Sequence, residues 1–471
     1  MTIQTRPATR KWWALAVIAA AQFVVIMDTS IIGIALPRMQ TDLGFSPENL
    51  TWVFNAYVIA FGGLLLLGGR LSDLLGARRI FATGWVVLLA GSVVAGAAGT
   101  VGIELAGRAV QGAGAALIAP AALALLMTLF GSSPQELTKA LAVYGAAAPA
   151  GGTAGVFLGG VLTEYLSWPW VFYINIPIAI LALIAVPVLM PSAPARPGSV
   201  DLLGAAAATA GLATAVYGIV RAPEAGWGSA QTWAVLGVAA ALLAGFVLLQ
   251  ARRREPLMPL SIFRAPGLAA ANLAQLLLGA AWVPMWFFLN LYLQQVLGYS
   301  AFPSGAALLP MTTLIMLGMI VLAPWAMQRF GAKPMIVTGL AVLGLGLGIM
   351  SLVRPSGSFW IDVLPASLVA AGGMSLAFIP SLGTAIGAAR PEEGGLASGI
   401  VNVSYQIGSA LGLAAMTALA AAFGADQLTD LPQLTDGYSA AFLGAGATAL
   451  VGAGLTAATM ASPAKTTSPA G

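Results

Sequence analysis

Long apolar stretches are the feature that most constrains this chain. A membrane-spanning helix needs about 20 consecutive, mainly apolar residues, and fourteen windows of that kind follow one another along the sequence. A helix satisfies every backbone group of such a segment within the segment itself, as the lipid interior requires. The sequence therefore predicts an all-α polytopic membrane protein, with spans near 12–36, 50–69, 80–99, 104–129, 138–162, 169–190, 201–220, 231–250, 268–293, 304–326, 333–352, 361–386, 396–421 and 438–460.

The composition narrows the function. The chain has 471 residues, of which 59% are hydrophobic and only 8% are charged, whereas a soluble domain carries about 25% charged residues. Cys and His are absent, which excludes disulfides, thiolate or imidazole metal sites and histidine acid–base chemistry. We expect no metal and no cofactor. No loop is long enough for a catalytic domain and no nucleotide motif is present. We therefore expect that the protein is not an enzyme or a receptor, and that it has no nucleic-acid partner.

The positions of Lys and Arg predict the orientation. Fourteen crossings place both termini on one side, and only Arg38, Arg221 and Arg354 then fall on the opposite side. The positive-inside rule makes the terminal side cytoplasmic, so we predict a bacterial inner-membrane protein with both termini in the cytoplasm. Apart from Arg108 within a span, all other basic residues lie on the terminal side: Arg6, Arg10, Lys11, Arg70, Arg78, Arg79, Lys139, Arg196, Arg252, Arg253, Arg254, Arg264, Arg329, Lys333, Arg390 and Lys465.

Two charged residues at membrane depth carry the strongest functional signal. Asp28 lies within an apolar run, where a carboxylate is costly unless it is neutral, paired or hydrated. Burial favours its protonated form, so Asp28 could load and release protons; alternatively it only hydrogen-bonds a neighbouring helix. Arg108 could pair with Asp28 or with backbone carbonyls, and could couple proton binding to substrate binding. The alternative is a structural ion pair or a side chain that reaches the interface.

A basic turn and a glycine stripe indicate moving parts. The turn Gly69–Arg79 contains Gly69, Asp73, Gly76, Arg78 and Arg79, and Asp73 could cap a helix or pair with Arg78 or Arg79. Such contacts would exist only when the cytoplasmic face is closed, which suggests a gate. Without family context, however, a basic topology loop is the favoured interpretation of this turn. A similar turn at 328–333 suggests two related halves.

Small residues on one helix face allow another backbone to approach closely. Gly151, Gly155 and Gly159 are spaced by four residues, and Gly160 follows them. We interpret these glycines as a packing stripe, and not as a phosphate loop, because no strand precedes them and no Lys-Ser/Thr follows.

Polar side chains also recur within the apolar windows. In lipid they face a partner helix or a cavity, and many could simply join helices by hydrogen bonds. The candidate residues for a substrate cavity are Gln111, Asn175, Asn272, Gln275, Trp282, Asn290, Asn402 and Gln406.

These segments together resemble the major facilitator superfamily, and more narrowly its fourteen-span drug:proton antiporter family. The chain departs from the family pattern at Val156, where the antiporter motif has proline, and at Trp168-Pro169-Trp170, where the family has Trp-Arg-Trp. The segments that carry the resemblance are Met27–Pro37, Gly69–Arg79, Leu105–Gly114, Gly151–Gly160, Asn175–Pro177 and Ser398–Gly412.

The resemblance implies a fold and roles for these residues. We expect two six-helix halves, 1–190 and 267–471, and a two-helix insert with its linkers at 191–266. Asp28 would bind the coupling proton, Arg108 would take part in coupling, and Asp73 with Arg78 and Arg79 would govern the inward–outward transition. Gly151–Gly160 would be the antiporter motif.

The predicted function is a proton-driven exporter of small amphipathic compounds such as drugs or antibiotics, which works by alternating access. The alternative is a specific metabolite exporter or a solute importer of the same superfamily. The expected partners are the small-molecule substrate, protons and the lipid bilayer, and we expect the monomer to be functional.

Overall fold

The computed structural model describes residues 8–192, 201–254, 256–388 and 394–460, which form helices and connecting turns, with no strand among these residues. The first part of the chain comprises α1 (Ala8–Leu43), η1 (Asn49–Thr51), α2 (Trp52–Leu75), α3 (Ala77–Gly96), α4 (Val101–Phe130), α5 (Pro134–Tyr165), α6 (Trp170–Tyr173), α7 (Asn175–Leu189), α8 (Leu202–Ala225) and α9 (Ala230–Arg252). The second part comprises η2 (Leu260–Arg264), α10 (Leu268–Leu291), η3 (Tyr292–Val296), α11 (Ala301–Ala307), α12 (Leu309–Leu317), η4 (Gly318–Leu322), α13 (Ala323–Phe330), α14 (Ala332–Met350), η5 (Phe359–Val363), α15 (Leu364–Ala388), α16 (Gly394–Ala422) and α17 (Leu431–Thr459).

The described residues contain fourteen helical segments that are long and apolar enough to cross a membrane, which confirms the predicted number. Most spans are single helices. One turn of π-helix ends the span Leu268–Val296 at η3, interrupts the span Ala301–Phe330 at η4 and begins the span Phe359–Ala388 at η5. The span Ala301–Phe330 is also divided into α11 and α12, and the span Trp170–Leu189 into α6 and α7. In that span Pro177 lies in the first turn of α7, where a residue without a backbone N–H is tolerated.

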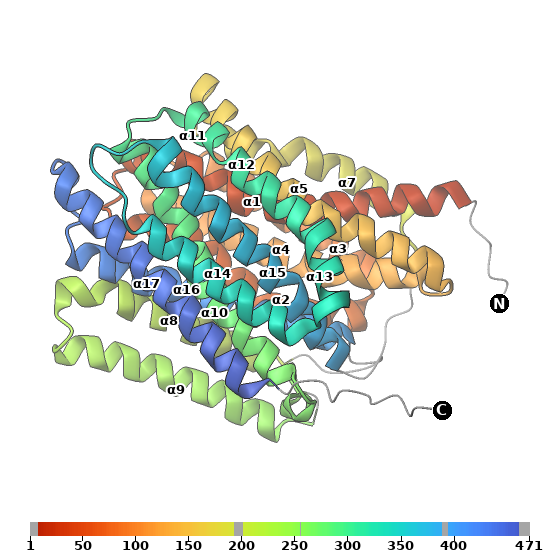
Figure 1. Cartoon of the computed structure of the whole chain (residues 1–471). Coiled ribbons are helices and arrows are strands. Elements are labelled where there is room, and N and C mark those ends of the chain that lie inside the picture. The colour runs from red at the N-terminus through yellow and green to blue at the C-terminus, as the bar shows by residue number, and fades with distance from the viewer. Residues whose placement is uncertain (1–7, 193–200, 255, 389–393, 461–471) are drawn as a thin grey trace.

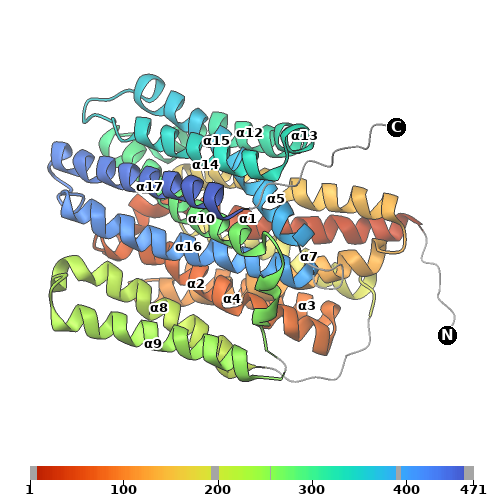
Figure 2. The same ribbon diagram turned by 60° about the horizontal axis from the view of Figure 1, so that its bottom comes forward.

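The helices pack as two groups with an additional pair, α8 and α9 (Figures 1 and 2). Helices α1–α7 pack on one another, and α10–α17 form the second group. Helix α8 packs against α2 of the first group and α16 of the second, whereas α9 packs against α8. Only 11% of the apolar window of α9 is buried, compared with 83% for the span Leu268–Val296. Helix α9 therefore exposes its side chains to lipid, while α10 lies at the centre of the bundle.

The two ends of the bundle differ. Both described chain ends, at α1 and α17, lie at the same end (Figure 1), which we call the terminal face; the opposite end is the far face. The helix order puts the predicted basic residues at the terminal face, but Arg6, Arg196, Arg390 and Lys465 lie outside the described residues. The proposed boundaries of the two halves and of the insert remain a prediction.

The short turns after α2 and α13 support an internal repeat. Gly76 has φ 92° and Gly331 has φ 81°, a backbone region that glycine adopts without steric cost. Each glycine ends one helix and precedes the next without a longer loop. The similarity between the two basic turns in the sequence therefore corresponds to a shared backbone geometry.

Candidate functional site

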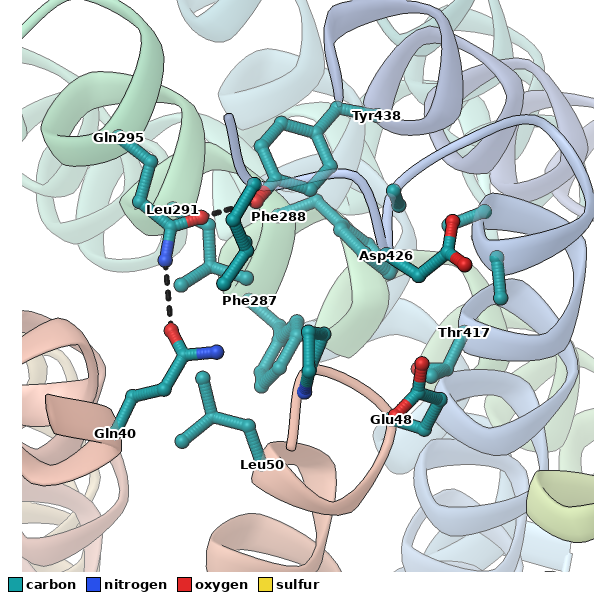
Figure 3. A pocket seen from close by; sticks show the side chains of 15 residues that line it. Gln40, Glu48, Leu50, Phe287, Phe288, Leu291, Gln295, Thr417, Asp426 and Tyr438 are labelled. Carbon is teal, nitrogen blue, oxygen red and sulfur yellow. Dashed lines mark hydrogen bonds between the residues drawn. The ribbon is translucent and has the colours of Figure 1, made fainter. Parts of the chain in front are cut away.

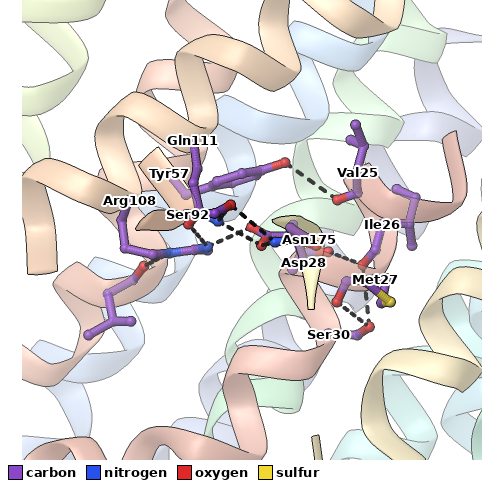
Figure 4. A network of polar contacts seen from close by, with 12 residues as sticks. Val25, Ile26, Met27, Asp28, Ser30, Tyr57, Ser92, Arg108, Gln111 and Asn175 are labelled. Atoms are coloured by element: carbon purple, nitrogen blue, oxygen red, sulfur yellow. Dashed lines mark hydrogen bonds and ion pairs between the residues drawn. The ribbon is translucent and has the colours of Figure 1, made fainter. Parts of the chain in front are cut away.

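Asp28 and Arg108 meet in the interior of the first helix group (Figure 4). The Arg108 Nη1 atom donates to Asp28 Oδ2 at 2.6 Å, and both side chains are 0% exposed. Arg108 Nε donates to the backbone carbonyl of Val53 at 2.9 Å. The two contacts that the sequence left as alternatives, a carboxylate and a backbone carbonyl, thus occur together.

Two amides and a hydroxyl complete this network. Gln111 Nε2 donates to Asp28 Oδ1 at 3.0 Å, and Asn175 Nδ2 donates to the same oxygen at 2.8 Å. Ser92 Oγ accepts from Gln111 Nε2 at 2.9 Å. The carboxylate of Asp28 therefore accepts three hydrogen bonds from side chains on α4 and α7, which offset its removal from water.

Aromatic rings enclose the guanidinium. The Arg108 Cζ atom lies 4.6 Å from the ring centroid of Tyr57 and 5.9 Å from that of Phe172. Such contacts stabilise a cation in a site that water does not reach. The network joins α1, α2, α3, α4, α6 and α7, so a change of charge at Asp28 would affect contacts throughout the first helix group.

Glu104 was not among the predicted site residues. It lies on α4 one turn before Arg108, is 0% exposed, and neither of its carboxyl oxygens has a hydrogen-bond partner among the described residues. The signal in the sequence was an acidic residue four positions before Arg108, at the edge of an apolar window. Ser92 and Tyr57 were also not predicted, because nothing in the sequence places α2 and α3 beside Arg108.

The glycine stripe on α5 lies in close contact with α1. A Cβ at Gly151 would lie 2.3 Å from the Phe23 carbonyl oxygen of α1, and one at Gly159 would lie 2.7 Å from the Ile31 carbonyl oxygen. At Gly155 it would lie 2.0 Å from Ser30 Oγ. These distances are too short for any side chain, so glycine lets α5 approach α1, the helix that carries Asp28.

Gly160 faces the second helix group instead. A Cβ there would lie 3.0 Å from the Ala301 carbonyl oxygen at the start of α11. At the same contact between the two helix groups, which we call the seam, a Cβ at Gly305 would lie 2.5 Å from the carbonyl oxygen of Val156. Val156 therefore occupies a tightly packed place between the two groups, although the family pattern has proline at this position.

Hydrogen bonds between the two groups lie toward the far face. Gln294 Nε2 donates to the Ile34 carbonyl oxygen at 3.0 Å, and Gln295 Nε2 donates to Gln40 Oε1 at 2.9 Å. Within the second group, Tyr438 donates its hydroxyl proton to Gln295 (Figure 3). A small pocket at this seam is lined by residues of both groups, among them Glu48, Leu50, Phe287, Thr417 and Asp426.

The terminal-face turn has a different arrangement. Asp73 is exposed, and within the described part of the chain it forms no ion pair with Arg78 or Arg79. Arg78 instead donates to the carbonyl oxygen of Pro187 at 3.0 Å, and Gly69 and Gly76 lie on either side of the last turns of α2. We expect the Asp73 contacts only in a state that is closed at this face, and the gating role stays a prediction.

The candidate cavity residues do not form one group. Gln111 and Asn175 belong to the Asp28 network. Asn272 Oδ1 accepts from Ser404 Oγ at 2.8 Å, and Gln275 Nε2 donates to Ser381 Oγ at 2.8 Å. These two side chains join α10 to α16 and α15, which is the helix-joining role that the sequence left open.

The remaining candidates lie near the seam or along α16. The rings of Trp282 and Trp286 are 6.4 Å apart, and a Cβ at Gly33 of α1 would lie 2.8 Å from Asn290 Nδ2. Among the described residues, Trp286 Nε1 and Asn290 Oδ1 are buried without a hydrogen-bond partner, so both could bind a polar ligand group. Asn402 Nδ2 donates to the Ser398 carbonyl oxygen at 2.8 Å, and Gln406 packs beneath Gly62.

Comparisons with known proteins agree with this architecture. The model of the Major Facilitator Superfamily matches residues 18–413 and 319–470. A solved D-xylose-proton symporter has a TM-score of 0.67 at 14% identity, with 96% of this chain and 98% of that chain covered. A proton-dependent oligopeptide transporter has a TM-score of 0.67 at 16% identity, with 95% and 98% covered. At these identities the two structures support the fold alone.

Curated relatives are more similar in sequence. A cephamycin export protein of Amycolatopsis lactamdurans is 39% identical, with 94% of this chain and 90% of the relative covered. A puromycin resistance protein of Streptomyces alboniger is 37% identical, with 92% and 87% covered. A tetracenomycin C resistance and export protein of Streptomyces glaucescens is 32% identical, with 89% and 78% covered.

Proposed function

The chain belongs to the major facilitator superfamily of membrane transporters, and from this premise we propose that it exports amphipathic, antibiotic-like molecules in exchange for protons. The observation that carries the proposal is the buried ion pair of Asp28 and Arg108, 2.6 Å apart within the first helix group. A carboxylate at membrane depth marks a proton or substrate pathway in most transporters. Here the carboxylate also accepts hydrogen bonds from Arg108, Gln111 and Asn175, so its protonation would change these contacts.

The arrangement of the two helix groups supports a mechanism of alternating access. Their hydrogen bonds lie toward the far face, and the basic residues at the terminal face support a cytoplasmic location of the termini. We propose that this is the inward-facing state. Protonation of Asp28 from the far side would weaken its pairing with Arg108, and the release of that proton to the cytoplasm would restore it. The halves would rock about a site between them.

The driving force is sufficient for export. One elementary charge that moves through a potential of about 100 mV releases about 2.3 kcal/mol. No cofactor is required in this scheme, and we propose that one chain suffices, because both helix groups belong to the same chain. The glycine contacts between α5 and α1 would transmit movement of α1 to the seam at Gly160 and Ala301.

The substrate class rests on the relatives and on the chemistry of the seam. The relatives are named for a cephamycin, for puromycin and for tetracenomycin C, which are chemically different compounds. Trp282, Trp286 and Asn290 offer aromatic surface and a few unpaired polar atoms, and not a set of charged anchors. This favours an amphipathic ligand over a sugar or an inorganic anion.

The test is transport into everted membrane vesicles, because their lumen corresponds to the outside of the cell. We expect energised vesicles that contain the wild-type protein to accumulate puromycin or tetracenomycin C, and Asp28→Asn to abolish the accumulation. The control is Asp436→Asn, an exposed carboxylate at the start of α17, which should behave as wild type. Full pH-dependent accumulation by Asp28→Asn would disprove the proton role, and proton-driven loss of substrate from the lumen would favour an importer.

A further inference from the structure

Glu104 is a buried acidic side chain that the scheme above does not use. It lies in the first turns of α4, between the far face and Arg108, and it is 0% exposed. Both carboxyl oxygens lack a hydrogen-bond partner among the described residues. An ionised carboxylate without a partner is strongly disfavoured in such a place. The start of α4 stabilises negative charge, but less than burial destabilises it, so Glu104 is a neutral carboxylic acid in this state.

Few other charges lie near Glu104. Arg108 is one turn away on the same helix, Asp28 is the acidic group of α1 in the interior, and Tyr57 lies on α2. The other ionisable groups of the helices that pack on α4 lie toward the helix ends or, for two tyrosines, elsewhere along the helix: Arg10, Lys11, Arg38 and Asp42 on α1; Arg70 and Asp73 on α2; Arg78 and Arg79 on α3; Glu136, Lys139, Tyr144, Glu164 and Tyr165 on α5; and Tyr405 on α16.

Arg108 has an unused donor that matches this unused acceptor. Its Nη2 atom is buried without a hydrogen-bond partner among the described residues, while Nε and Nη1 bind Val53 and Asp28. Side chains four residues apart on a helix are neighbours. A rotation of the two side chains would therefore let Arg108 pair with an ionised Glu104 with no movement of the backbone of α4.

We propose that Glu104 is a second proton-binding site, through which the coupling proton reaches Asp28. The Glu104 carboxylic acid gives its proton to the Asp28 carboxylate, and Arg108 turns from Asp28 to the newly formed Glu104 carboxylate. Asp28 then releases the proton to the terminal face, and Glu104 takes a new proton from far-face water when that face opens. The total charge of the three groups is unchanged by the transfer, and the ionised carboxylate is paired with Arg108 both before and after it.

This inference rests on the proposed proton coupling, but its first test needs no transport. Infrared spectra of the purified protein with isotope-labelled glutamate report the carbonyl stretch of protonated glutamic acid side chains. We expect a band in the wild type that Glu104→Gln lacks. In Asp28→Asn the same band should disappear, because Arg108 then lacks its anion and Glu104 ionises to replace it. A band that persists in Asp28→Asn, or a wild type without one, would overturn the proposal, and this comparison does not require Glu104→Gln to fold.

The second test separates a relay from a structural role. In everted vesicles with puromycin as the probe, Glu104→Gln should lose the response of transport to acidification of the lumen, which corresponds to the far side, and Glu104→Asp should restore it. Both Glu104→Gln and Glu104→Asp should still bind puromycin when no proton gradient is present. A wild-type pH response in Glu104→Gln would refute the relay. Failure of the wild type to move puromycin against its gradient would instead count against the proposed function, and the infrared result would stand separately.

Discussion

The guanidinium of Arg108 is half of a buried ion pair, which can serve function without adding to stability. It bonds Asp28, Gln111 and the Val53 carbonyl oxygen, and its planar fork is suited to several partners at once. A buried pair of this kind is weak evidence for stability, because desolvation of both charges offsets their attraction. Removal of Arg108 alone, however, leaves the buried carboxylate of Asp28 without a compensating charge.

Arg108→Met tests this asymmetry. We expect the variant to lose about 3–5 kcal/mol of stability, the cost of stranding one charge of a buried pair, and to lose transport. Asp28→Asn added to Arg108→Met should recover much of the stability, because the unpaired carboxylate is gone, but not the transport. Unfolding of the purified proteins by heat or denaturant measures the first effect. Equal stability of the single and double variants would contradict this account of the pair.

Sequence reasoning found part of this site. Asp28 and Arg108 stand out because charged residues are rare in apolar helices, and their pairing was among the alternatives. Gln111 and Asn175 were candidates for a substrate cavity, and the structure shows that both donate hydrogen bonds to Asp28. Glu104 was missed because it begins an apolar window, where an acidic residue resembles the end of a loop. Its burial depends on how α4 packs against α1, α2 and α3, which a local pattern does not encode.

At the level of elements, apolar length predicted all fourteen spans. It did not predict the π-helical turns at η3, η4 and η5, because these depend on the fit of one helix to its neighbours. Nor did it predict the different places of α8 and α9, since apolar length does not say which helices a span contacts. In the structure α8 fills the seam between α2 and α16, with Thr209 against Gly63, whereas α9 lies at the periphery.

Helix α5 contains one glycine in the stripe and one outside it that can be compared. Gly151→Ala places a Cβ 2.3 Å from the Phe23 carbonyl oxygen, and overpacking of this kind costs about 1–3 kcal/mol. Gly145 lies on the same helix, and a Cβ there would meet nothing within 4 Å. Gly145→Ala should therefore leave thermal stability equal to that of the wild type or slightly higher, since alanine favours helix by up to about 1 kcal/mol. Similar stabilities of the two variants would show that α1 and α5 are not in close contact.

For the whole molecule, the seam at the far face should open and close in each cycle. The pair Gln40→Cys and Gln295→Cys replaces side chains that bond across this seam at 2.9 Å, and the chain has no cysteine of its own. A short thiol-reactive cross-linker should join the two positions and stop transport. The control pair is Lys11→Cys and Glu136→Cys, which replaces a 2.6 Å ion pair between α1 and α5 of the same helix group. If cross-linked Gln40→Cys/Gln295→Cys protein transports normally, this seam does not open during the cycle.

The central claim is that outward movement of substrate is coupled to inward movement of protons through Asp28. The most direct measurement uses purified protein in liposomes with an imposed puromycin gradient and a pH-sensitive dye, without any other energy source. We predict that puromycin flux drives protons in the opposite direction in the wild type and in Asp436→Asn, and that Asp28→Asn moves no protons. Puromycin flux without proton movement, or with protons in the same direction, would contradict the account.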